Sequence, residues 1–354
     1  MKLKNLIILA AVSFSLMACE NQTNEFDDFG STSVYFPYQT PVRTLILGEY
    51  DLGFNENDNN GRFEIGVVMS GVYENTTDRK VYFEQAPELI NPATLVDIDS
   101  VNVKVLPSSY YTIEQESPVT IPSGSTKGRI PVQLEDAFFN DPQSFADFGE
   151  VHYVIPLKIT DFEQLDSLLT GVPAEDIVNP IKIKSDDWDT LPKDYTLFGI
   201  KFMNKYQGIY LRRGEDKMTD ASGETVSTVY QAEYVVQDEL VPLNTSGRYK
   251  VELSNIIRRG GLPSPGNVNI ELAFNENGDC TISSFGDDIY NVSGSGKFET
   301  DGDEWGGEKR DVIYLDYSYT DAANNETHVV KDTLVIRDRN VKFEEFDIEL
   351  KVSQ

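Results

Sequence analysis

A tryptophan in an acidic, glycine-rich segment has the surroundings best suited to ligand binding. Trp305 has three acids before it and two glycines after it: Asp301, Asp303, Glu304, Gly306 and Gly307. An indole offers a flat apolar surface to a pyranose ring, and carboxylates accept hydrogen bonds from sugar hydroxyls. Because few local side chains could cover this indole, the pattern predicts a stacking platform for a sugar. Packing of Trp305 onto the end of its domain is the alternative.

Tyrosines in the carboxy-terminal half supply further aromatic candidates. Tyr206 and Tyr210 belong to one predicted strand and Tyr314 to a later one. Side chains alternate between the faces of a strand, so Tyr314 faces the side opposite to Tyr317 and Tyr319. Many of these rings must fill the core. Tyr206, Tyr210 and Tyr314 nevertheless join the indole and its acids in the predicted glycan-binding set.

Two arginine pairs stand out in this acidic chain, Arg212 with Arg213 and Arg258 with Arg259. Guanidinium groups could contact an anionic sugar. Ion pairing at the surface is the alternative interpretation.

Catalytic residues show no recognisable arrangement. The two histidines, His152 and His328, each lie in a predicted strand, where a structural role is expected. Adjacent carboxylates are common by number alone in a chain with 59 acidic residues, so they indicate little about glycosidase chemistry. The sequence therefore predicts a protein that is not an enzyme.

The sequence indicates no metal site and no cofactor. Residues 55–61 contain many oxygen ligands, but the position of Gly61 and the lack of a closing glutamate favour a turn over a calcium loop. Cys19 and Cys280 are the two cysteines. Once Cys19 is modified, neither a disulfide within the chain nor a thiolate cage can form, and Cys280 is expected to be a small buried side chain.

Lipid attachment is indicated at the amino terminus. Lys2 and Lys4 precede the short apolar run Leu6–Leu16, and Met17, Ala18 and Cys19 follow it. This order is typical of a bacterial lipoprotein signal, with an ordinary secretory signal as the alternative. Residues 1–18 are thus predicted to be the signal peptide and Cys19 the lipid anchor that holds the protein on a membrane.

Charge limits the partners. The chain has 59 acidic and 30 basic residues and a net charge of -29, which repels nucleic-acid phosphates. Residues 19–30 are predicted to form a lipidated acidic tether. Acids directly behind a lipidated cysteine resemble the surface-export signal of Bacteroidetes lipoproteins. They predict a location on the outer membrane facing the cell surface, with the periplasmic face as the alternative.

An immunoglobulin-like β-sandwich is predicted for residues 31–185. Short alternating runs separated by Gly, Pro, Asn, Asp and Ser are typical of antiparallel strands in such a domain. The clearest runs are residues 62–69, 101–105, 127–134 and 152–159. One or two helical turns are expected over residues 161–169.

A second β domain is predicted after a polar, proline-broken junction at residues 186–194. Residues 195–354 are again predicted to form a series of strands, and Asn277-Gly278 marks a hairpin turn. An up-and-down barrel is favoured because closure removes exposed sheet edges, with a second sandwich as the alternative. Trp188 is expected to pack between the two domains.

Longer stretches resemble a known family. Residues 34–50, 65–73, 119–124 and 153–160 are similar to the amino-terminal domain of Bacteroidetes surface lipoproteins, a domain also found beside family 18 glycosidase modules. Residues 188–214 resemble the start of the calycin-like domain that accompanies it. The family 18 acid pattern is absent from the sequence, and the resemblance supplies no catalytic residues.

The resemblance to SusE-like lipoproteins of polysaccharide-utilisation loci implies function and partners. It implies capture of an oligosaccharide or polysaccharide for import by a TonB-dependent transporter with a SusD-like lipoprotein. A structural subunit of the uptake complex, acting through protein contacts, is the alternative, and a hydrolase ranks third.

Overall fold

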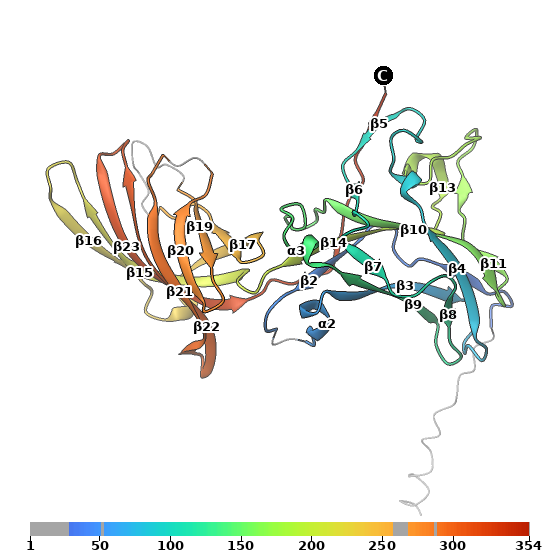
Figure 1. Ribbon diagram of the computed structural model, residues 1–354, viewed down its shortest axis with the longest axis horizontal. Helices are drawn as coiled ribbons and strands as arrows, with labels where there is room; N and C mark the ends of the chain where they lie inside the picture. The colour runs from blue at the N-terminus through green and yellow to red at the C-terminus, as the bar shows by residue number, and fades with distance from the viewer. Residues whose placement is uncertain (1–27, 51–52, 258–267, 287–288, 354) are drawn as a thin grey trace, which may run out of the picture.

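The computed structural model describes residues 28–50, 53–257, 268–286 and 289–353. It contains two β-rich bodies joined at one end (Figure 1). The helices are single turns: α2 Glu56–Asn59, α3 Asp136–Phe139 and the 3-10 helices η1 Pro87–Leu89, η2 Ser185–Asp187 and η3 Val235–Gln237. None of the helices in these ranges is long and apolar enough to cross a membrane. The predicted all-β class is confirmed.

The amino-terminal body is a sandwich of two sheets. The five-stranded sheet contains β1 Ser33–Tyr35, β3 Arg62–Ser70, β7 Tyr111–Ile113, β9 Lys127–Leu134 and β11 Ser167–Leu168. The seven-stranded sheet contains β2 Pro41–Ile46, β4 Arg79–Gln85, β6 Lys104–Val105, β8 Val119–Ile121, β10 Tyr153–Glu163, β14 Tyr195–Met203 and β24 Glu344–Glu345. Two small pairs complete it: β12 Val172–Pro173 with β13 Trp188–Thr190, and β5 Ile98–Val101 with β25 Leu350–Val352.

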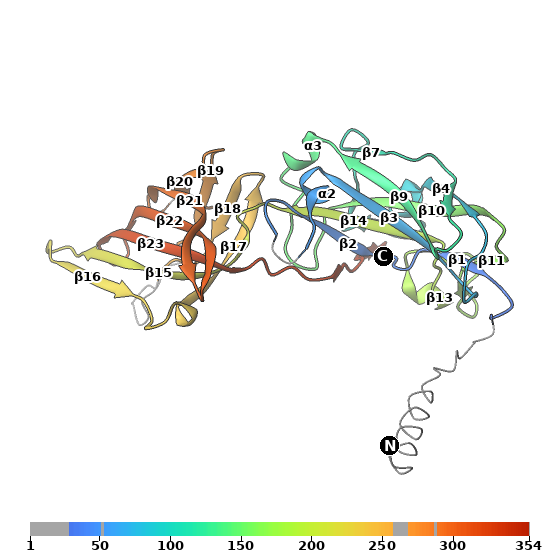
Figure 2. The same cartoon turned by 90° about the horizontal axis from the view of Figure 1, so that it is seen from below.

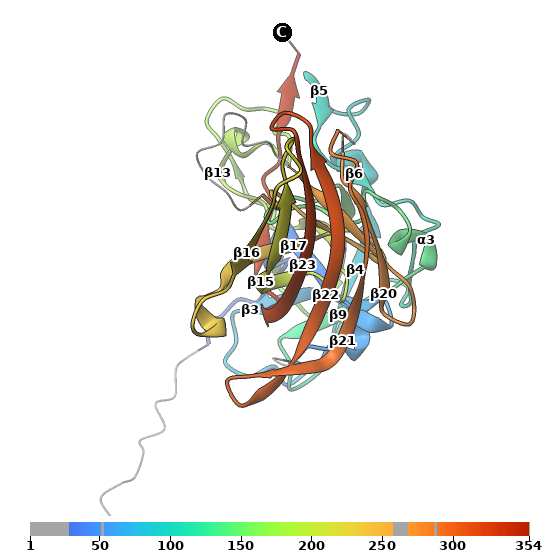
Figure 3. The same cartoon turned by 90° about the vertical axis from the view of Figure 1, so that its left-hand side faces the viewer.

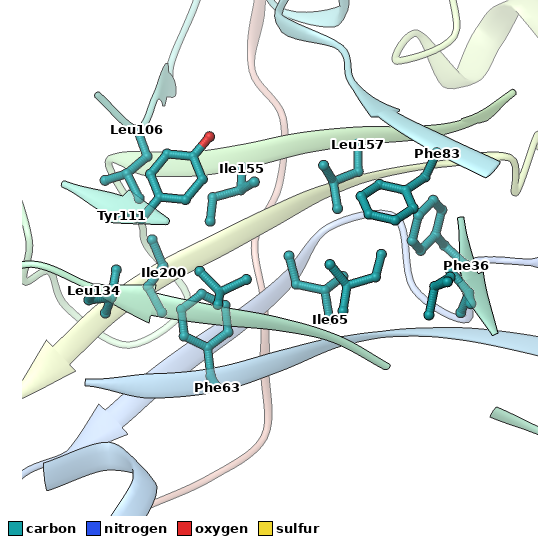
Figure 4. Close-up of a cluster of buried hydrophobic side chains, with 14 of the residues drawn as sticks. Phe36, Phe63, Ile65, Phe83, Leu106, Tyr111, Leu134, Ile155, Leu157 and Ile200 are labelled. Atoms are coloured by element: carbon teal, nitrogen blue, oxygen red, sulfur yellow. The ribbon is translucent and has the colours of Figure 1, made fainter. Parts of the chain in front are cut away.

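The core of the sandwich is apolar and lies between the two sheets. Phe63 and Ile65 on β3 face Ile155 and Leu157 on β10, and Phe36 lies at one end of the row (Figure 4). Each of these five side chains is at most 5% exposed. Alternation places them there, because successive side chains of β3 point in and out along its length.

The predicted start of the second domain at residue 195 is wrong. β14 pairs antiparallel with β10 and parallel with β2, so residues 195–203 complete the seven-stranded sheet. The sequence predicted strands from residue 195 onward, but a strand's own residues do not tell which strand it pairs with. Residues 204–207 then cross to the second body, which begins with β15 Gly208–Thr219.

Two local expectations are also wrong. Residues 161–169 form no helix: β10 runs to Glu163, and β11 pairs in parallel with β1. Trp188 is not at a domain junction, because it lies in the small β12–β13 pair of the sandwich. There its indole N–H donates to the Ile181 carbonyl at 2.9 Å.

The carboxy-terminal body is a closed eight-stranded antiparallel barrel, so the alternative of a second sandwich is excluded. Pairing of β15 with the last strand closes the ring, and β16 extends β15 outside it. Figure 3 shows the long strands of this body nearest the viewer. Besides β15 they are β16 Thr225–Tyr230, β17 Glu239–Gly247, β18 Lys250–Leu253, β19 Ile270–Phe274, β20 Asp279–Ser284, β21 Ser293–Trp305, β22 Glu308–Asp321 and β23 Glu326–Asp338.

The chain returns from the barrel to the sandwich. β24 pairs with β2 and β25 with β5, so the last described residues belong to the first body (Figure 2). The buried Lys201 ammonium of β14 pairs with Glu344 of β24 at 2.6 Å. The Arg339 guanidinium joins the two crossing segments by donating to the carbonyls of Asn204, at 2.7 Å, and Leu47, at 3.2 Å.

Candidate functional site

A cleft of about 410 Å³ lies where the two bodies meet. The sandwich supplies residues of the 142–152 loop and the end of β14, and the barrel supplies residues of β17 and β18 together with Gln207 and Phe285. The return segment supplies residues 340–342 and Glu344. Clefts of this size at domain interfaces are common ligand sites.

The sandwich wall of the cleft is fixed by the Lys201–Glu344 pair. Lys201 also donates to the carbonyls of Asp147, at 2.7 Å, and Glu150, at 3.1 Å. Glu344 accepts a 2.8 Å hydrogen bond from the Gly149 amide. These bonds hold both ends of the turn that carries Phe148, whose side chain remains 63% exposed. The backbone is thus anchored while the ring stays accessible.

The barrel wall is polar and held by a side-chain network. The side-chain oxygen Oε1 of Gln207 accepts hydrogen bonds from the Thr245 backbone amide, at 3.0 Å, and from the Thr245 hydroxyl, at 2.5 Å. The Ser246 hydroxyl donates to Glu271 at 3.3 Å. Asn244 lies opposite Glu252 across the β17–β18 pair and hydrogen bonds to it. This wall therefore presents amides and hydroxyls in fixed positions.

Two carboxylates approach the cleft from opposite bodies, Glu252 on the barrel and Asp147 on the sandwich. Burial raises the pKa of Glu252, the charge of Asp147 raises it further, and the hydrogen bond from Asn244 opposes both. A carboxyl group with a raised pKa keeps its proton to higher pH and can then donate a hydrogen bond as well as accept one.

The cleft therefore combines aromatic rings with planar polar groups. Phe148 from the sandwich and Phe285 from the barrel, which is 38% exposed, are its accessible rings. The exposed His152 also lines it, just before β10 rather than inside a strand. An apolar ring face with amide, hydroxyl and carboxyl groups beside it matches a sugar, which has an apolar face and a polar edge.

Trp305 lies at the tip of the β21–β22 hairpin. Gly306 and Gly307 form the two-residue turn with φ of 68° and 80°, a conformation that favours glycine. The indole is half-buried, with the Arg310 guanidinium carbon 5.3 Å from its ring centroid. Arg310 also pairs with Glu308 at 2.6 Å. A cation thus covers one face of the predicted platform.

The hairpin brings together only part of the predicted acid set. Asp303 lies opposite Arg310, and Trp305 lies opposite Glu308, so Asp303 and the indole share one face. Glu304 is on the other face, opposite Lys309. Asp301 adopts a φ of 53° where the strand register shifts, and its amide donates to the Asp311 carboxylate at 3.1 Å.

The predicted tyrosines separate into two groups. Tyr314 is 36% exposed on the outer face of the barrel, and burial raises its pKa, as do the nearby Asp303 and Glu299. Tyr206 and Tyr210 are fully buried, so they cannot contact a ligand at the surface. Tyr206 stacks on Phe274 with ring centroids 3.8 Å apart. Alternation along the chain predicted which of these rings share a face, but it did not predict which face points inward.

Phe148 and Phe285 were missed by the sequence interpretation, although a signal was present. Phe148 lies in Asp147-Phe148-Gly149, and Phe285 is followed by Gly286. Both patterns repeat the Trp305 arrangement of an aromatic residue next to glycine in a polar turn. These phenylalanines were overlooked because tryptophan was favoured as the residue that stacks on a sugar.

Several predicted features lie outside the described residues. They are the signal peptide, Cys19, most of the acidic tether and the arginine pair Arg258 and Arg259. Arg212 is described and is buried rather than at the surface. Its guanidinium donates to the Asp332 carboxylate at 2.8 and 2.9 Å and to the Tyr317 hydroxyl at 3.1 Å.

Two family models match the chain. One, described as a domain of unknown function (DUF5627), matches residues 205–340 and thus the barrel. The other, described only as a "-like, N-terminal domain", matches residues 27–165 in the sandwich. A search of curated proteins found no match to the chain.

Solved structures identify the family. A Bacteroides ovatus protein of unknown function is 32% identical, with a TM-score of 0.79, and the alignment covers 92% of this chain and 100% of that one. The chain belongs to the same family as this protein.

Two more distant structures share low identity with the chain. A multidomain Bacteroides ovatus protein that includes DUF1735 is 13% identical, with a TM-score of 0.40 and coverage of 90% of this chain and 99% of that one. An auxiliary nutrient binding protein from Bacteroides thetaiotaomicron is 13% identical, with a TM-score of 0.37 and coverage of 83% and 90%.

Proposed function

We propose that this protein is a non-catalytic glycan-binding lipoprotein that holds an oligosaccharide in the cleft between its two domains. The observation that carries the proposal is the combination of exposed Phe148 and Phe285 rings with fixed amide, hydroxyl and carboxyl groups from both bodies. The hairpin face with Trp305, Asp303 and Tyr314 is the second candidate contact surface.

A glycan array probed with the soluble chain from Asn21 onward tests the proposal. The oligosaccharide that binds most tightly is then titrated by calorimetry against Phe148→Ala and Phe285→Ala. Loss of one aromatic contact should weaken binding by roughly 1–3 kcal/mol. Phe54→Ala is the matched control, because Phe54 is exposed and lies outside the cleft.

The same titration distinguishes the two candidate surfaces. If Trp305→Ala weakens binding while both cleft variants bind as the unmodified protein does, the glycan binds at the hairpin. If no oligosaccharide binds, glycan capture is wrong.

The proposed context is the outer membrane, with the protein anchored through Cys19, facing the cell surface and serving a TonB-dependent transporter with a SusD-like lipoprotein. The support is the lipoprotein signal and the acids behind Cys19. Cys19→Ala should release the protein from the membrane fraction or leave it unprocessed. Unchanged lipid labelling and fractionation would contradict the anchor.

A role as a structural subunit of the uptake complex is the second candidate function, and strand β16 favours it. Among the described strands β16 pairs with β15 alone, and Val226 and Val229 on it are 46% and 60% exposed. An exposed edge with apolar side chains can add a strand from a partner. Under this hypothesis, Val229→Lys abolishes co-purification with the transporter and leaves glycan affinity unchanged.

A further inference from the structure

A second cavity, of about 360 Å³, opens on the side of the sandwich and is distinct in character from the interdomain cleft. Phe36 and Ile65 line it from the five-stranded sheet side, Thr196 and Phe198 line it from β14, and residues 341–343 of the return segment form another wall. We call this cavity the sandwich groove. Its volume lies at the small end of the range for ligand sites, which suits a molecule of about one ring.

Aromatic side chains dominate the sandwich groove. Tyr38 and Phe343 are 47% and 64% exposed, with ring centroids 5.2 Å apart in a tilted arrangement. Phe198 is stacked on Phe63, which holds its ring in place. Rings at such distances contact a further ring favourably, edge to face or offset.

Three residues of the largely apolar lining carry hydroxyls: Tyr38, Thr44 and Thr196. The Thr44 hydroxyl donates to Glu344 at 2.8 Å. Thr196 lies on the same face of β14 as Phe198, Ile200 and Phe202, which point into the sandwich. It is 1% exposed, and its Oγ1 has no hydrogen-bond partner among the described residues. Rotation about the Cα–Cβ bond exchanges the hydroxyl with the methyl group. A buried hydroxyl without a partner is costly, so its presence in a ligand-sized cavity indicates a partner from the ligand.

The charged side chains of the sandwich groove already have partners. Arg43 pairs with the buried carboxylate of Asp58. The Lys342 ammonium lies 5.6 Å from the centroid of the Phe148 ring. Both cations of the lining therefore contact groups that lie outside it, Asp58 and Phe148, and the lining includes no carboxylate. Its hydroxyls are too few for the many hydroxyls of a sugar.

We propose that the sandwich groove binds a small uncharged aromatic molecule with one hydroxyl group, a ligand of the phenol class. The ring packs against Phe198, Tyr38 and Phe343, and the ligand hydroxyl hydrogen bonds to Thr196 Oγ1. This site is independent of the proposed glycan function, since it needs neither Phe148 nor the barrel.

Phenol, toluene and glucose are the probes, titrated into the soluble chain from Asn21 onward and followed by saturation-transfer NMR. Phenol and toluene should bind saturably and compete with one another, while glucose should compete with neither. Thr196→Val should weaken the affinity for phenol about threefold to tenfold and change the affinity for toluene by less than about twofold. The reason is that the substitution removes one hydrogen bond and keeps the shape of the side chain. Phe343→Ala should weaken both aromatic probes, by about tenfold.

Controls keep the outcome decisive. Thr196→Val should fold and melt at the same or a higher temperature, because it removes an unpaired buried hydroxyl. Phe54 is an exposed phenylalanine outside the groove, so Phe54→Ala should leave the affinities for phenol and toluene unchanged. The proposal is overturned if neither aromatic probe binds saturably, if Thr196→Val weakens phenol and toluene equally, or if Phe343→Ala leaves both affinities unchanged.

Discussion

The two bodies of this protein fill their interiors in different ways. The sandwich encloses an apolar core such as the Phe63, Ile65, Ile155 and Leu157 row. The barrel is apolar near the sandwich, around Tyr206 and Phe274, but further along β15 and β23 it encloses Arg212, Asp332 and His328. The interior of the barrel therefore contains a buried ion pair, whereas the space between the two sheets of the sandwich is filled by apolar side chains.

Breaking the ion pair of the barrel tests this difference most strongly. Arg212→Ala should lower the free energy of unfolding by about 3–5 kcal/mol, because it leaves the fully buried Asp332 carboxylate without its counter-ion. Urea unfolding followed by circular dichroism measures it. The double variant Arg212→Met with Asp332→Leu should recover most of the loss, since neither charge is then buried alone. A loss below about 1 kcal/mol for Arg212→Ala would show that water reaches this pair.

Truncation in the sandwich core is the matching change without charge. Leu157→Ala should cost about 2–5 kcal/mol through lost burial and the cavity it leaves. Conservative Leu157→Met should cost less than about 1.5 kcal/mol. Equal losses for the two variants would contradict a tightly packed apolar core.

Smaller effects are expected from pH at the cleft between the bodies. The folded-state pKa of Glu252 is raised above its ordinary value of 4.5, so the folded protein holds this proton to higher pH than the unfolded chain does. The free energy of unfolding should therefore fall as pH rises from the unfolded pKa through the raised folded pKa, and Glu252→Gln should remove that part of the fall. Urea unfolding of both proteins over about pH 4–7 measures the difference. Parallel pH profiles would be the contrary result.

The smallest expected effect concerns Cys280, in the apolar half of the barrel. Burial raises the pKa of its thiol to about 12, with a further contribution from Asp279 and an opposing one from the Gly296 backbone hydrogen bond. In the chain from Asn21 onward Cys280 is the single thiol. Ellman's reagent should label this thiol only at urea concentrations that unfold the protein. It should not change the stability of the native protein at lower urea concentrations. Rapid labelling of the native protein would show that the barrel opens.

Local patterns in the sequence predict the strands well but not their partners. The short strand runs that include β3 and β10 correctly indicated a sandwich, and the Asn277-Gly278 turn lies between β19 and β20. The pairing of β14 with β10 and β2 was missed because the paired residues are 37–47 and 157 positions apart in the sequence, respectively. The pairing of β24 with β2 was missed for the same reason.

The candidate site shows a further limit. Alternation placed Tyr314 on the opposite face from Tyr317 and Tyr319, which is confirmed, because Tyr314 is exposed and the other two are buried. It could not show that Tyr206 and Tyr210 face inward, since both faces of the strand predicted for them carry large apolar residues. The cleft itself is formed by the meeting of two bodies, which no local pattern describes.

The return of the chain to the sandwich has a mechanical consequence. Both described ends of the chain belong to the sandwich, and β2–β24 and β5–β25 pair there. Arg339 joins the outgoing and returning crossings where they lie side by side. A force applied between Asp28 and Ser353 would therefore load these two strand pairs in shear first. The barrel would carry no tension until these strand pairs separated, because it lies in the chain between segments that are both held by the sandwich.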